Sequence, residues 1–88
     1  MKREQLSDDG LKRTTWTFIA RDQQVTLASV AVESKPSKRH RKWLTKARWD
    51  SWLRGHIPAL PPQDVIDSVL EEVRASVTYV EPRETREW

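Results

Sequence analysis

Hydrophobic and polar residues alternate along residues 14–21, TTWTFIAR. Trp16, Phe18 and Ala20 share one parity, and β-branched and aromatic residues dominate the run. Both properties are typical of a strand with one buried face. The polar residues 21–24 that follow predict a hairpin loop of about four residues.

A second strand is predicted over residues 25–34, VTLASVAVES, because β-branched residues recur along it. Its hydrophobic phase changes midway, since Val25 and Leu27 share one parity and Val30 has the other. A β-bulge near residues 28–29 would restore the alternation, as would a strand that is buried on both faces.

Residues 39–54 fit two structures. As a strand, residues 39–49 would complete a three-stranded meander, which gives a better core than a lone hairpin. As a helix, Thr45 would be the N-cap and Gly55 would lie at the C-terminal cap. We favour the strand and expect Trp49 and Trp52 to point into the core, because large aromatic side chains dominate the burial available to so small a domain.

In the strand interpretation, side chains alternate between the two faces of the sheet. One face would carry Trp43, Thr45, Ala47 and Trp49, and the other Leu44, Lys46 and Arg48.

The clearest helical pattern lies at residues 62–75, after the proline-rich connector HIPALPP. Pro62 suits a first turn, where its missing N–H costs nothing. Apolar side chains recur at spacings of three and four and form one stripe: Val65, Ile66, Val69, Leu70, Val73 and Val77. We expect this stripe to cover the sheet face that carries Trp16 and Phe18.

These elements predict an α+β fold. It has a small antiparallel sheet of two to three strands, one amphipathic helix packed on a face, and a short C-terminal strand at residues 77–80. The predicted organisation is a flexible N-terminus (1–12), a single domain (13–80) and a charged tail (81–88).

Composition limits the class of protein. The chain has 88 residues, of which 36% are hydrophobic and 33% charged, and it has no cysteine. Disulfides, thiolate nucleophiles and cysteine-containing zinc sites are therefore excluded. The polar start of the chain does not match a secretory signal, and no apolar run approaches the ~18 residues of a membrane span. We expect no membrane association and a cytoplasmic location.

Charge is distributed unevenly along the chain. Residues 34–54 hold eight Lys or Arg and one acid, a net charge of +7, whereas residues 55–88 have a net charge of −4. Two interpretations follow. The basic segment contacts an acidic partner, or the acidic C-terminal helix neutralises it from within.

Three tryptophans lie among these cations, and cations interleaved with aromatic rings are typical of surfaces that bind nucleic acids. The leading prediction is therefore a nucleic-acid-binding surface over residues 35–48, made by Lys35, Lys38, Arg39, Arg41, Lys42, Trp43, Lys46 and Arg48. The competing interpretation is simpler: charge runs are usually solvated, and tryptophans are usually core.

No constellation of catalytic residues is recognisable. Glycine occurs only at positions 10 and 55, which excludes a glycine-rich phosphate loop. His40 and His56 lack carboxylates at metal-ligand spacing. The acids of the predicted helix are interpreted as its solvent side. We therefore expect no enzymatic activity, no metal and no cofactor.

The run ESKPSKRHRKW, followed by the PALPPQDVIDSVLEEVR helix, resembles small uncharacterised proteins of bacteriophages and other mobile elements. The resemblance covers about half of the chain and implies no catalytic or binding residue. It implies an alternative function: an inhibitor or adaptor that occludes a host protein, such as a polymerase, a nuclease or a CRISPR effector, in the host cytoplasm. An edge strand and a thin core are also compatible with a homodimer.

Overall fold

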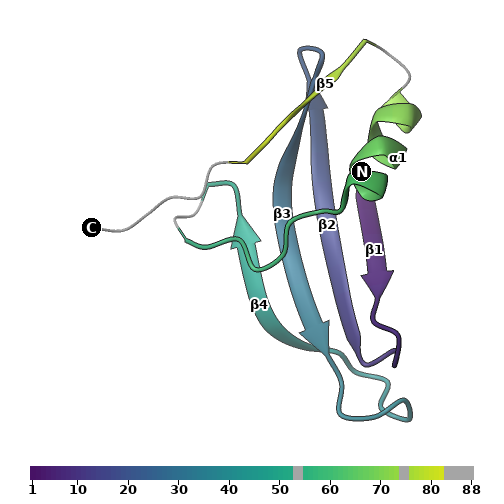
Figure 1. Cartoon of the computed structure of the whole chain (residues 1–88). Helices are drawn as coiled ribbons and strands as arrows, with labels where there is room; N and C mark the ends of the chain where they lie inside the picture. Colours follow the sequence, from purple (N-terminus) through teal and green to yellow (C-terminus); the bar gives the residue numbers. More distant parts are fainter. Residues whose placement is uncertain (53–54, 74–75, 83–88) are drawn as a thin grey trace.

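The computed structural model describes residues 1–52, 55–73 and 76–82. In chain order the elements are β1 (Lys2–Leu6), β2 (Lys12–Arg21), β3 (Gln24–Ser34), β4 (Leu44–Asp50), α1 (Gln63–Val73) and β5 (Thr78–Val80). The α+β class is confirmed, but the sheet is larger than the two to three strands that the sequence predicts (Figure 1).

Four strands form an antiparallel meander in the order β1-β2-β3-β4. The short β5 runs parallel to β3 at residues 24–26, on the edge of β3 that β4 occupies further along. β1 lies within residues 1–12, for which the sequence predicts a flexible N-terminus and no strand. Its sequence, KREQL, has little strand propensity, and it becomes a strand by pairing along β2, from Lys2 opposite Thr17 to Leu6 opposite Arg13.

The β2–β3 connection is tighter than predicted. Arg21 pairs with Gln24, so the turn consists of Asp22 and Gln23 alone. Both have positive φ, 52° and 63°, which is the type I′ conformation that matches the twist of a hairpin. Such turns usually contain Asn or Gly, and the absence of both from this one explains why the sequence predicts a longer loop.

The predicted bulge in the second strand is confirmed. Thr17 pairs with Ser29 and Phe18 with Leu27, so Ala28 is the extra residue. The bulge places the buried residues of β3, which are Val25, Leu27, Val30 and Val32, on one face despite their change of parity. This face is the core of the sheet, where the buried strand residues are Trp16, Phe18, Val25, Leu27, Val30, Val32 and Trp49.

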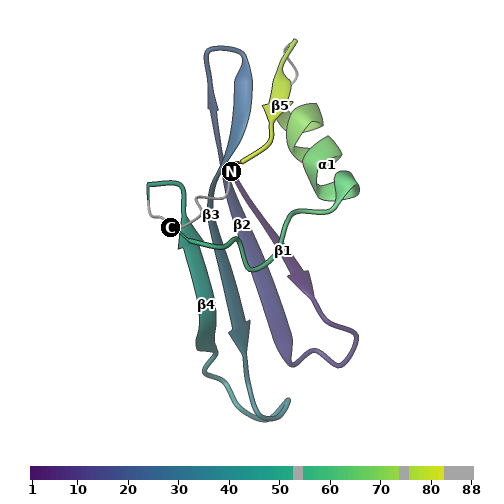
Figure 2. The same cartoon turned by 60° about the vertical axis from the view of Figure 1, so that its left-hand side comes forward.

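A single layer, formed by α1 and the connector that precedes it, covers this face (Figures 1 and 2). α1 places Val69 in the same cluster as Trp16 and Phe18, which confirms the predicted packing of the helix. The connector before it crosses the sheet, buries Ile57 and accepts a 3.1 Å hydrogen bond from the Trp16 indole at the Ala59 carbonyl. Among the described residues, no segment covers the opposite face of the sheet, because α1 and the connector both lie on the side of Trp16.

The β4 segment is a strand, as favoured, although it begins at residue 44 rather than 39. The helix prediction of 62–75 is confirmed over Gln63–Val73, and residues 74–75 lie outside the described part. The short C-terminal strand is confirmed as β5. Of the predicted tail, only residues 81–82 are described.

Candidate binding surface

Residues 35–42, here called the basic loop, lie between β3 and β4 at the lower end of the sheet in Figure 1. The Lys35 N–H donates to the Leu11 carbonyl at 2.9 Å, which ties the loop to the β1–β2 turn beside it. Within the loop, the His40 N–H donates to the Ser37 carbonyl at 3.1 Å, and the Ser37 hydroxyl lies 2.7 Å from His40 Nδ1. These hydrogen bonds give the loop a defined turn at residues 37–40.

The central cations of the loop face solvent. Arg39, Arg41 and Lys42 are exposed, and none of them forms an ion pair with another described residue. Lys38 is exposed beside the β1–β2 turn. Hydrogen bonds from Ser7 and from the backbone of Leu11 lower the pKa of the Asp9 carboxyl in this turn, and the Lys38 charge contributes weakly in the same direction.

The acidic helix does not neutralise the loop. Glu72 of α1 pairs instead with Arg3 of β1, at 3.1 Å. The other ion pair in the described part of the chain is Arg13–Glu33, at 2.8 Å. The interpretation of internal neutralisation by the helix is therefore wrong, because the fold places α1 far from the lower end of the sheet (Figure 1).

Trp43 is packed against cations of the protein itself. The Arg13 guanidinium lies 4.6 Å from the centroid of its ring, and the Lys35 ammonium lies 4.7 Å from it. Arg13 is held in place by two hydrogen bonds to Glu33, of 3.0 and 2.8 Å. Cations attracted by the ring occupy the area that a nucleobase would need for stacking.

A second β-bulge, at Lys46, separates the two predicted cations of β4. Val32 pairs with Ala47 and Glu33 with Thr45, so Lys46 has no partner in the register. Lys46 therefore lines a hollow on the core side of the sheet together with Ala47, whereas Arg48 lies on the open face. The simple alternation predicted for this strand is wrong before residue 47, because the bulge shifts it by one residue.

The prediction that both tryptophans point into the core is right for Trp49, which is 5% exposed, and wrong for Trp52, which is 79% exposed. Trp49 lies opposite Val30 on the core face. β4 ends at Asp50, so Trp52 belongs to the turn that follows and takes no part in the alternation of the strand.

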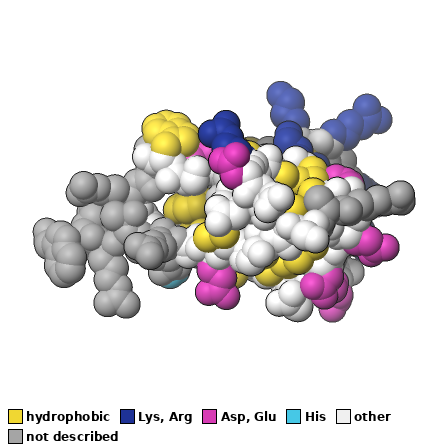
Figure 3. Space-filling view, turned by 90° about the horizontal axis from the view of Figure 1, so that it is seen from above, with side chains coloured by type: hydrophobic (Ala, Val, Ile, Leu, Met, Phe, Trp, Pro, Cys, Tyr) yellow, Lys and Arg dark blue, Asp and Glu magenta, His cyan; other side chains and the backbone are white. Residues whose placement is uncertain are grey.

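The open face of the sheet is polar. It forms a shallow hollow lined by Lys2, Glu4, Arg13, Thr15, Thr17, Ser29, Ala31, Glu33, Thr45 and Arg48. Figure 3, which views the molecule from above, shows Lys and Arg mainly along one side and Asp and Glu mainly along the other. The carboxylates of Glu4 and Glu33 within this hollow reduce its attraction for anions.

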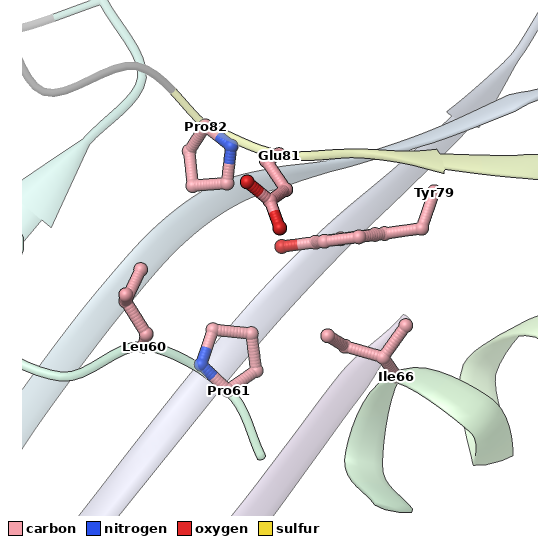
Figure 4. A pocket seen from close by; sticks show the side chains of 6 residues that line it. All are labelled: Leu60, Pro61, Ile66, Tyr79, Glu81 and Pro82. Carbon is pink, nitrogen blue, oxygen red and sulfur yellow. The ribbon is translucent and has the colours of Figure 1, made fainter. Parts of the chain in front are cut away.

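An apolar pocket lies between the connector and β5 (Figure 4), lined by Leu60, Pro61, Ile66, Tyr79, Glu81 and Pro82. Burial raises the pKa of the Tyr79 hydroxyl, and the Glu81 carboxylate raises it further. The pocket has a volume of about 140 Å³. Ligand pockets usually span ~300–1,000 Å³, so this one is too small for a typical ligand.

Metal-binding clusters of three or more His, Asp or Glu are absent from the described residues. No helix in the same part of the chain is long and apolar enough to cross a membrane. Comparison with protein-family models, with curated proteins and with solved structures finds no match for this chain.

Proposed function

We propose that this chain is a non-catalytic binding protein whose basic loop contacts the phosphates of a nucleic acid. The observation that supports the proposal is the exposure of Arg39, Arg41 and Lys42 at one end of the sheet, without ion-pair partners among the described residues. When exposed, unpaired cations contact phosphates, the counterions that surround the nucleic acid are released. This release is the main source of sequence-independent affinity.

The geometry favours phosphate contacts over base stacking at the loop. Trp43 is occupied by Arg13 and Lys35. Trp52 lies beyond the far end of β4, about 20 Å from the loop at the usual rise of a strand. Within the predicted set, the loop cations therefore contribute most to affinity, and Trp43 holds the base of the loop in place.

The test compares two double variants with the same change in net charge. Arg39→Glu/Arg41→Glu alters the basic loop, and Lys2→Glu/Arg21→Glu alters two exposed cations outside it. Binding to DNA and RNA oligonucleotides is measured by fluorescence anisotropy at several salt concentrations. The loop variant should weaken binding at least about tenfold and lower the salt slope by ~1–2, since each lost phosphate contact removes ~0.7–0.9.

Circular dichroism should show both variants folded. Equal losses in the two variants would show that net charge, rather than the loop, carries the binding. Absence of any binding by the unaltered protein at low salt would refute the proposed function.

The exposed Trp52 favours a second candidate, an inhibitor or adaptor that occludes a host polymerase, nuclease or CRISPR effector. Aromatic side chains are enriched among residues that dominate protein interfaces, and this one is 79% exposed. Trp52→Ser should then weaken binding to the purified host protein by about tenfold or more. The Arg39→Glu/Arg41→Glu variant should have a smaller effect on that binding, and the reverse ranking would reject this candidate.

We propose a cytoplasmic location, in the host cell if a phage encodes the chain. Homodimerisation is proposed through an outer strand, since β1 and β4 are the ends of the meander. Light scattering after size exclusion would show twice the chain mass for the dimer and a single chain mass if this is wrong.

A further inference from the structure

A hollow on the core side of the sheet adjoins the basic loop and shares only Lys46 with the predicted site. It is open to solvent and has a volume of about 530 Å³. It lies where β3 and β4 meet the loop, below the connector. Its lining residues are Lys12, Thr14, Val32, Ser34, Lys46, Ala47, Pro58 and Ala59.

The described residues of the lining combine cations, hydroxyls and aliphatic surface, and none of them carries a carboxylate. Lys12 and Lys46 are exposed. Thr14 and Ser34 are half-buried, and their hydroxyls make no hydrogen bond to any other described residue. The open-face hollow, by contrast, contains two glutamates. Charge and hydrogen-bonding capacity therefore favour an anionic ligand on the core side.

Two features of the tertiary structure create this hollow. Lys12 lies opposite Ser34 in the β2–β3 register, which brings a residue far from the basic segment to its edge. The β4 bulge directs Lys46 toward the same hollow as Ala47, its neighbour in sequence. Two cations from different strands thus converge on an aliphatic surface made by Val32, Ala47 and the connector.

We propose that this hollow holds one unpaired nucleotide of a single-stranded nucleic acid whose flanking phosphates contact the basic loop. The inference rests on the function proposed above and specifies its substrate class. Lys12 and Lys46 attract the phosphate. The base lies on the aliphatic surface of Val32 and Ala47, and the hydroxyls of Thr14 and Ser34 bond to polar atoms of the nucleotide.

A single strand suits this hollow because its bases are free to leave the stack at little cost. In a duplex the bases are paired and stacked, and moving one of them into a pocket costs a few kcal/mol. A duplex would therefore contact the loop through its phosphates and leave the hollow empty. The consequence is a preference for single strands that depends on the hollow and is separable from the contribution of the loop.

The test uses a mixed-sequence oligonucleotide of about 12 nucleotides, within the ~4–16 that one small domain covers, as a single strand and as a duplex. Binding is measured by fluorescence anisotropy at low salt for DNA and RNA. The unaltered protein should bind the single strand about tenfold or more tightly than the duplex, a difference of ~1.4 kcal/mol.

Ala47→Leu fills the hollow without changing charge, and it should abolish the preference for single strands while leaving affinity for the duplex unchanged. Because a core-side substitution can affect folding, a second variant, Lys12→Gln/Lys46→Gln, alters only exposed side chains. It should weaken single-strand binding about tenfold and duplex binding by a small factor. Lys2→Gln/Arg21→Gln is its charge-matched control and should not change the preference.

The outcomes distinguish this inference from the proposed function. Equal binding of single strand and duplex, with both losing affinity only in the loop variant, would overturn the nucleotide site and retain the basic loop. A preference that survives both Ala47→Leu and Lys12→Gln/Lys46→Gln would also overturn the site. No binding of either nucleic acid by the unaltered protein would overturn the proposed function itself.

Discussion

The guanidinium of Arg3 donates a 2.7 Å hydrogen bond to the hydroxyl of Ser68, which lies 65 positions further along the chain. Arg3 also donates to the Ser68 carbonyl at 3.4 Å and pairs with Glu72 at 3.1 Å. One side chain of the edge strand β1 thus fastens α1 to the sheet. The segment 2–6 consequently belongs to the folded domain.

We expect Arg3→Ala to lower the free energy of unfolding by about 1.5–3 kcal/mol, the usual value of hydrogen bonds from a charged group. The ion pair adds little, because Glu72 is 52% exposed. Urea denaturation measures the effect. Lys2→Ala is the control, and as an exposed residue it should change stability by no more than ~0.5 kcal/mol. Equal effects of the two substitutions would show that Arg3 does not fasten the helix.

The β2–β3 turn offers a stabilising substitution. Gln23 has φ of +63°, a conformation that costs non-glycine residues ~1–2 kcal/mol. Gln23→Gly should stabilise the protein by about 0.5–1 kcal/mol, since the greater freedom of glycine in the unfolded chain offsets part of the gain. The hydrogen bond from the Thr78 N–H to the Gln23 carbonyl is unaffected.

The control for the turn is Gln24→Gly, which places glycine at the start of β3. It should destabilise the protein by about 0.5–1 kcal/mol. Destabilisation by both substitutions in thermal denaturation would contradict the type I′ turn.

The packing of Trp43 against Arg13 predicts an energetic coupling between them. A double-mutant cycle of Arg13→Met and Trp43→Leu should give a coupling energy of about 0.5–1 kcal/mol, the range of partly exposed cation–π contacts. Arg13→Met also removes the ion pair with Glu33. This loss occurs both with and without Trp43→Leu, so its energy cancels in the cycle. A cycle of Lys42→Met with Trp43→Leu should give little or no coupling. Comparable values in the two cycles would exclude a specific contact between Arg13 and Trp43.

Tyr79 predicts a change of stability at high pH. Burial, and secondarily the Glu81 carboxylate, raise the pKa of its hydroxyl above the ordinary value near 10. The folded state therefore holds this proton more tightly than the unfolded state. Its contribution to stability is complete below pH ~10 and is lost as pH rises through the folded-state pKa.

Tyr79→Phe keeps a ring that can pack edge-on against Phe18, whose centroid lies 6.3 Å away, and removes the titrating hydroxyl. The unaltered protein should therefore lose more stability than Tyr79→Phe between about pH 8 and pH 11 in urea denaturation. Parallel losses would show that Tyr79 does not contribute to the pH dependence.

Local patterns were sufficient for the elements with strong periodicity. The alternation around Trp16 and Phe18 predicted β2, and the apolar stripe with Ile66 and Val69 predicted α1, because burial of one face is encoded directly in residue spacing. The bulge at Ala28 was also predictable, since a change of parity in a strand has few structural solutions.

Other features had no local signal. β1 consists of polar residues and exists only through its pairing with β2 and the bonds from Arg3 to α1. The bulge at Lys46 follows from the β3–β4 register, and the convergence of Lys12 on the same hollow follows from the β2–β3 register. Neither register can be inferred from the sequence of one β-strand alone.

The sequence by itself determined the α+β class, the core aromatic Trp16 and the position of the basic loop, because hydrophobic spacing and charge density are local properties of the chain. The tertiary structure alone decided which cations remain free, that Trp43 is packed and Trp52 exposed, and that Lys12, Ser34 and Lys46 share one hollow. Those relationships depend on strand register and on which face the helix covers, and they arise only when distant segments pair.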